Sequence, residues 1–150
     1  MKENDPYLKI QSDIGQYGWH CLNVWPLAGD DEHTAFSYTI GLTESYGHPE
    51  IMVFGLGDKA HGILTECANL IKGGSRFAEG QPNGDVLAND YKVVFKQVRK
   101  DRFGEYLGTA IRYYGSRRFD AFVLFWPNKQ HELPWESEEP GVQAEALDIV

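Results

Sequence analysis

Three short runs rich in β-forming residues follow one another near the start of this chain, and they constrain its fold more than any other feature. The runs cover residues 19–25, 34–42 and 50–56, and the connections between them are short. Strands joined by short connections pair most simply as antiparallel neighbours, because a parallel pair needs a long crossover. The sequence therefore predicts an antiparallel meander in this part of the chain.

Helical stripes alternate with two more predicted strands in the rest of the chain. Apolar residues recur at helical spacing over residues 7–17, 60–71 and 103–114. Residues 91–98 and 119–126 carry the side chains typical of two further strands. The order α-β-β-β-α-β-α-β predicts an α+β fold, in which a mainly antiparallel sheet of about five strands is covered by about three helices.

The length of 150 residues fits one domain, so we expect residues 1–150 to fold as a single unit. No repeat and no linker-like segment divides the chain. Beyond Glu136 the sequence is acidic and is interrupted by Pro140. We therefore expect residues 137–150 to form a loosely ordered acidic tail.

The formal net charge of −8 limits the partners of the protein. Nucleic acids and anionic lipids both require a basic surface, so neither is expected as a partner. A basic protein partner fits the charge, although acidity also simply keeps cytosolic proteins soluble. No apolar run approaches the roughly 20 residues of a membrane span, and no secretory signal is visible. These features predict a cytoplasmic protein.

Motifs of the common catalytic and metal sites are missing from the sequence. It contains no phosphate-binding loop, no GxGxxG string and no GxSxG string. Its five histidines form no HExxH or HxH pair, and its two cysteines form no CxxC pair. We therefore assign no catalytic residue, no metal ligand and no cofactor.

The string YTIGL at residues 38–42, followed by GHPE at 47–50, is the first candidate site. Tyr38 and Thr39 offer hydroxyls, His48 can exchange a proton near neutral pH, and Glu50 begins the next strand. Together these side chains could form the rim of a pocket. Alternatively, the residues are there for turn chemistry, since glycine and proline shape turns wherever they occur.

Two tryptophans that flank a proline-containing loop form the second candidate site. Trp126, Asn128 and Trp135 lie around this loop, and an aromatic shelf there would bind a ring or a peptide. The alternative is a lid that anchors the loop by packing onto the end of the last strand.

Several longer strings resemble one known family. They are Trp19-His20, FSYTIGL, YGHPEIMVFGL, the segment Arg76–Gly80 and WPN with LPWE, and they extend from about Gly15 to Glu136. These strings resemble a bacterial family of unknown function, the domain family numbered 4262. Asn128 departs from the family pattern, which usually has an aspartate there. The resemblance favours a functional role for YTIGL and HPE but implies no activity.

Two functions from different classes are compatible with the sequence. The first is a non-catalytic binding protein of the cytosol, for example an immunity-type protein that neutralises a toxin; acidity and the missing catalytic motifs favour it. The second is a small-molecule or flavin-binding enzyme with its site around YTIGL and HPE, because this strand pair loosely resembles flavin-binding split barrels. Between the two, the sequence favours the binding protein.

Overall fold

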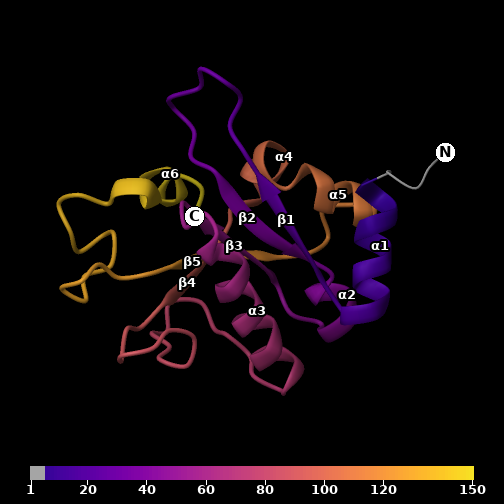
Figure 1. The fold of residues 1–150 in the computed structure, drawn as a ribbon, viewed down its shortest axis with the longest axis horizontal. Helices are drawn as coiled ribbons and strands as arrows, with labels where there is room; N and C mark the ends of the chain where they lie inside the picture. The colour runs from indigo at the N-terminus through magenta and orange to yellow at the C-terminus, as the bar shows by residue number, and fades with distance from the viewer. Residues whose placement is uncertain (1–5) are drawn as a thin grey trace.

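The computed structural model describes residues 6–150, and a five-stranded sheet organises this part of the chain (Figure 1). The strand order is β1-β2-β3-β5-β4. The β1–β2, β2–β3 and β4–β5 pairs are antiparallel, whereas β3 and β5 are parallel. The strands are β1 (His20–Val24), β2 (Phe36–Ile40), β3 (Glu50–Phe54), β4 (Val94–Gln97) and β5 (Ala121–Phe125).

Helices cover both faces of the sheet. They are α1 (Pro6–Tyr17), α2 (Leu42–Tyr46), α3 (Lys59–Lys72), α4 (Phe103–Tyr106), α5 (Gly108–Tyr114) and α6 (Ala144–Leu147), with 3-10 turns at Lys100–Arg102 and Gly141–Gln143. Buried residues of α1, α4, α5 and α6 share one core with one face of the sheet. Helix α3 and the segment that follows it form a second core on the other face.

The three central strands are buried on both faces, which explains their almost continuous apolar sequences. Along β3, for example, Met52 and Phe54 enter the core on the α1 side, whereas Ile51 and Val53 enter the core on the α3 side. Strand β1 pairs only with β2 and is an edge of the sheet. Its other long edge therefore has no neighbouring strand among the described residues.

The α+β class and the mainly antiparallel five-stranded sheet are confirmed, but the helices differ from the prediction. The expected helix over 103–114 is two short helices that meet at Leu107. The connection between β2 and β3 contains α2, a helix that the sequence did not predict. Asp58 stands at the start of α3, yet its side chain makes no capping hydrogen bond. The sequence also suggests a cap for the first helix at Asn4 or Asp5, and both residues lie outside the described part of the chain.

The end of the chain differs from the loosely ordered tail that the sequence predicts. Ala146 and Ile149 are fully buried in the core beside α4. The backbone N–H of Arg99 donates to the carbonyl oxygen of Ile149 at 2.8 Å. Composition misled the prediction here, because a few well-placed apolar side chains are enough to dock an otherwise acidic segment.

Candidate functional site

Glu50, the first residue of β3, accepts four hydrogen bonds in the protein interior. Its Oε1 accepts from the Thr39 hydroxyl at 2.8 Å and from the Leu42 backbone N–H at 3.2 Å. Its Oε2 accepts from the Thr43 backbone N–H at 3.0 Å and from the Tyr114 hydroxyl at 2.5 Å. The carboxyl group thus joins β2, the first turn of α2 and α5 to β3.

Burial governs the acidity of this group. The Glu50 side chain is fully buried, and burial raises the pKa of its carboxyl above the usual value, although the hydrogen bonds from Tyr114, Thr43 and Thr39 favour the charged form. The N–H groups of Leu42 and Thr43 would otherwise lack acceptors at the start of α2. Glu50 therefore caps this helix from eight residues away in sequence.

Gly41 completes the junction between β2 and α2. It has φ +116°, and a Cβ atom there would lie 2.9 Å from both the Gly18 carbonyl oxygen and the Ile14 Cγ1 atom. Its N–H donates to the Tyr114 hydroxyl at 3.0 Å. Glycine is needed at this position both for its backbone angle and for the close approach of the end of α1.

Replacing Gly41 by alanine is expected to lower the free energy of unfolding by about 2–4 kcal/mol, because strain and a backbone clash act together. Gly15→Ala is the matched control, since nothing lies within 4 Å of its added Cβ in the last turn of α1. That variant should be unchanged or more stable by about 1 kcal/mol. Urea denaturation of both variants measures the difference, and equal stabilities would contradict the role of Gly41.

His48 is also buried, and both of its ring nitrogens have partners. Nδ1 lies 2.9 Å from the Pro49 carbonyl oxygen, and Nε2 accepts the Phe77 backbone N–H at 3.1 Å. This pattern requires the neutral tautomer with hydrogen on Nδ1. Burial lowers the pKa of His48, and the charge of Arg76 adds to this, against an opposing effect of the Pro49 carbonyl.

The structure brings two of the four residues of the first candidate site into contact. Thr39 and Glu50 share a hydrogen bond, whereas Tyr38 enters the core near α5 and His48 packs against Phe77 on the α3 side. Burial raises the pKa of the Tyr38 hydroxyl to about 12. All four residues are buried. Their contacts within the protein explain the YTIGL and HPE strings structurally, and their role as a binding site stays a prediction.

The second candidate site is partly assembled. Trp126 and Asn128 line a cleft of about 300 Å³, whereas Trp135 is not among its lining residues. The Asn128 side chain accepts the backbone N–H groups of Gln130 and Glu132, which shapes its own loop. Trp135 is half exposed, lies edge-on to Phe125 and has the Lys96 ammonium 4.2 Å from its ring centre. These contacts anchor the loop, and the role of Trp126, Asn128 and Trp135 in binding stays a prediction.

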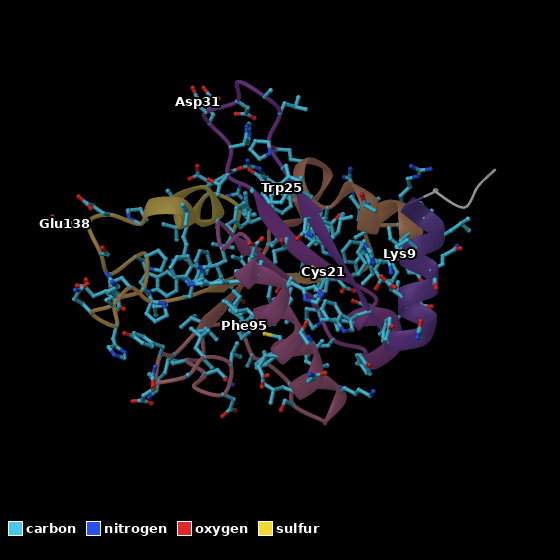
Figure 2. The ribbon with its side chains drawn as sticks, viewed as in Figure 1. Lys9, Cys21, Trp25, Asp31, Phe95 and Glu138 are labelled. Carbon is cyan, nitrogen blue, oxygen red and sulfur yellow. The ribbon has the colours of Figure 1, made fainter. Side chains whose placement is uncertain are left out.

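Another cleft lies at the free edge of β1, between α1 and α3. It has a volume of about 460 Å³, and Figure 2 labels two of its lining residues, Lys9 and Cys21. The His20 Nδ1 atom lies 2.7 Å from the Asp13 Oδ2 atom. Sequence reasoning missed this pair because the two residues sit on different elements with no motif between them.

The loop between β1 and β2 is the third feature of interest. It projects from the top of the molecule in Figure 1, and Figure 2 labels Trp25 and Asp31 on it. Trp25 is 67% exposed and Leu27 is 83% exposed. Below them lies a groove of about 230 Å³, lined in part by the carboxylates of Asp30, Glu105 and Glu145.

Two kinds of feature are absent from the described residues. Between residues 6 and 150, no cluster of three or more His, Cys, Asp or Glu side chains is arranged to hold a metal ion. In the same range, no helix is both long enough and apolar enough to span a membrane.

Comparison with known proteins gives one match. A family model described as a domain of unknown function (DUF4262) matches residues 13–140. No curated protein and no solved structure matches the chain significantly.

Proposed function

The chain belongs to the DUF4262 family, and we propose that it is a non-catalytic interaction protein that binds a basic protein partner through its β1–β2 loop. An immunity-type protein that neutralises a toxin is one example of this class. The proposal places the protein in the cytoplasm, where its two free cysteines, Cys21 and Cys67, remain reduced.

The exposure of Trp25 and Leu27 on one projecting loop carries the proposal. Burying a side chain the size of leucine contributes about 1.5–3 kcal/mol of favourable free energy. Trp25 and Leu27 are mostly exposed, so most of this contribution is missing in the free protein. Tryptophan is also enriched among the residues that dominate the free energy of protein–protein binding. A partner that covers both side chains would bury them in the interface, and this burial would contribute to the free energy of binding.

Charge around the loop supports a basic partner. Asp30, Asp31 and Glu32 follow the two apolar residues, and the groove below adds Glu105 and Glu145. Three of these carboxylates have hydrogen-bond partners within the protein: Asp30 accepts the Glu32 backbone N–H at 2.9 Å, Glu105 accepts from Arg102 at 2.7 Å and Glu145 accepts from the Tyr106 hydroxyl at 2.7 Å. Each carboxylate can accept about four hydrogen bonds, so capacity remains for a lysine or arginine of the partner. Opposite charges also speed encounter.

The absence of an activated nucleophile near the cleft between α1 and α3 supports a non-catalytic role. Burial raises the pKa of the Cys21 thiol to about 11, so the thiol stays protonated at neutral pH. No hydroxyl among residues 6–150 hydrogen-bonds to the Nε2 atom of His20. A histidine held by aspartate needs such a neighbour to act in nucleophilic catalysis.

Affinity capture with the full chain tests the proposal. Wild type should retain a basic protein from cytosolic extract at low salt and release it at high salt. With purified components, Trp25→Ala is expected to weaken binding by about 30-fold, the effect of a typical hot spot. Leu27→Ala should also weaken it, whereas Leu8→Ala, which truncates an exposed leucine on α1, should not.

Two results would overturn the proposal. One is that the full chain retains no basic protein from the extract, even at low salt. The other is equal binding by the Leu27→Ala and Leu8→Ala variants, because contact through the loop requires them to differ. As a further check, the double variant Asp31→Asn with Glu32→Gln should slow association more than it speeds dissociation.

A further inference from the structure

The cleft at the free edge of β1 combines three kinds of group that recognise small molecules. Its volume of about 460 Å³ is within the range of roughly 300–1,000 Å³ typical of ligand sites. Helix α1, strand β1 and helix α3 all contribute side chains to its wall. It is separate from the β1–β2 loop and shares no lining residue with the groove below that loop.

A prepositioned imidazole is the first group. Asp13 accepts from His20 Nδ1 at 2.7 Å and from the Lys9 ammonium at 2.9 Å. Burial raises the pKa of Asp13, but the hydrogen bonds from Lys9 and His20 outweigh it, so the net pKa is below the usual value. The ionised carboxylate fixes the ring with Nδ1 as donor. Nε2 has no hydrogen-bond partner among the described residues, which leaves it for a ligand.

An aromatic platform is the second group. The rings of Trp19 and His61 are stacked, with centroids 6.1 Å apart and planes 27° apart, and both line the cleft. Tyr46 lines it as well. Planar rings bind to such surfaces by offset stacking or edge contacts.

Positive charge is the third group. Lys9 and Lys72 line the cleft, and Asp13 is the single carboxylate among its described lining residues. Lys9 is already paired with Asp13, whereas no ion pair of Lys72 is recorded among residues 6–150. The lining of this cleft therefore carries more positive than negative charge, which is unusual on a protein of net charge −8. This excess favours binding of an anion in the cleft.

We infer that this cleft binds a small molecule that joins a planar ring to an anionic group, either a carboxylate or a phosphate. The planar ring of the ligand packs against Trp19 and His61. Its anionic group accepts a hydrogen bond from the Lys72 ammonium, and the ligand also contacts His20 Nε2. The inference does not depend on the partner of the β1–β2 loop.

Two matched pairs of probes test this inference by calorimetry: AMP with adenosine, and indole-3-acetate with indole. At least one anionic probe should bind with a Kd below about 1 mM and at least about tenfold more tightly than its neutral counterpart. Which anion binds distinguishes phosphate from carboxylate. Bound probe should also shift the indole N–H signal of Trp19 and the ring signals of His20 in NMR spectra.

Two lysines on the same helix supply the matched variants. Lys72→Gln should remove most of the preference for the anionic probe, whereas Lys59→Gln, an equal change in charge at the other end of α3, should leave it intact. The inference is overturned if neither anionic probe binds better than its neutral counterpart. It is equally overturned if the two lysine variants bind the probes alike.

Discussion

Replacing Glu50 by alanine is expected to lower the free energy of unfolding by about 3–5 kcal/mol. The truncation leaves four donors without their acceptor in the interior: the hydroxyls of Thr39 and Tyr114 and the N–H groups of Leu42 and Thr43. Each unsatisfied buried donor costs about 1–3 kcal/mol, and relaxation makes the sum smaller than four separate losses. A domain of this size is stable by about 5–15 kcal/mol, so the variant should lose a large fraction of its stability.

Two further variants separate the hydrogen bonds of Glu50 from its other properties. Tyr114→Phe removes one donor and keeps the carboxyl, so it should cost about 1–2 kcal/mol. Glu66→Ala removes an exposed carboxylate from α3 and should change stability by less than about 0.5 kcal/mol. Urea denaturation at neutral pH measures all three variants. A Glu50→Ala variant within 1 kcal/mol of wild type, about the uncertainty of such comparisons, would show that the network contributes little.

The same network shows why α2 could not be predicted from local sequence. Residues 42–46 contain no helical stripe long enough to recognise, and a five-residue helix has little stability of its own. Its start depends on the left-handed Gly41 and on the carboxyl of Glu50, which approaches from the next strand. The sequence shows both residues but not the contact between them.

Strands were easier to predict than their arrangement. Residues 50–56 and 119–126 were recognised because strands buried on both faces require apolar residues at nearly every position. The parallel pairing of β3 with β5 was not predicted, because these strands are separated by α3, β4 and two short helices. Nothing in the local pattern of either strand records its partner.

The features with the clearest chemistry for binding were not the ones that the sequence singled out. Trp25 was assigned to a strand, and its exposure depends on β1 ending at Val24 so that the loop projects. His20 falls within the predicted strand over residues 19–25, and its contact with Asp13 depends on how α1 lies against the edge of the sheet. Unusual strings such as YTIGL mark positions where packing is demanding, which need not be where ligands bind.

His48 is expected to make the fold sensitive to acid between pH 7 and pH 5. Its Nε2 accepts the Phe77 N–H, so a proton there would place two donors face to face in the interior. Because burial lowers the pKa of folded His48, the unfolded chain takes up a proton near pH 6.5 while the folded protein does not. The contribution of neutral His48 to the free energy of unfolding is therefore complete above pH 6.5. It is lost as the pH falls below 6.5, by up to about 1.4 kcal/mol per pH unit.

His48→Gln isolates this contribution, because glutamine offers an acceptor near the position of Nε2 and does not titrate. The relevant quantity is the difference in the free energy of unfolding between wild type and variant. Burial raises the pKa of the Glu50 carboxyl, so the contribution of Glu50 to stability depends on pH in the opposite direction, and it cancels in this difference. Between pH 7 and pH 5 wild type should lose stability relative to the variant, by at most about 2 kcal/mol. Urea denaturation at pH 5, 6 and 7 measures the difference. A difference that stays constant over this range would mean that folded His48 accepts a proton as readily as the unfolded chain, and its neutral, doubly bonded ring would then be excluded.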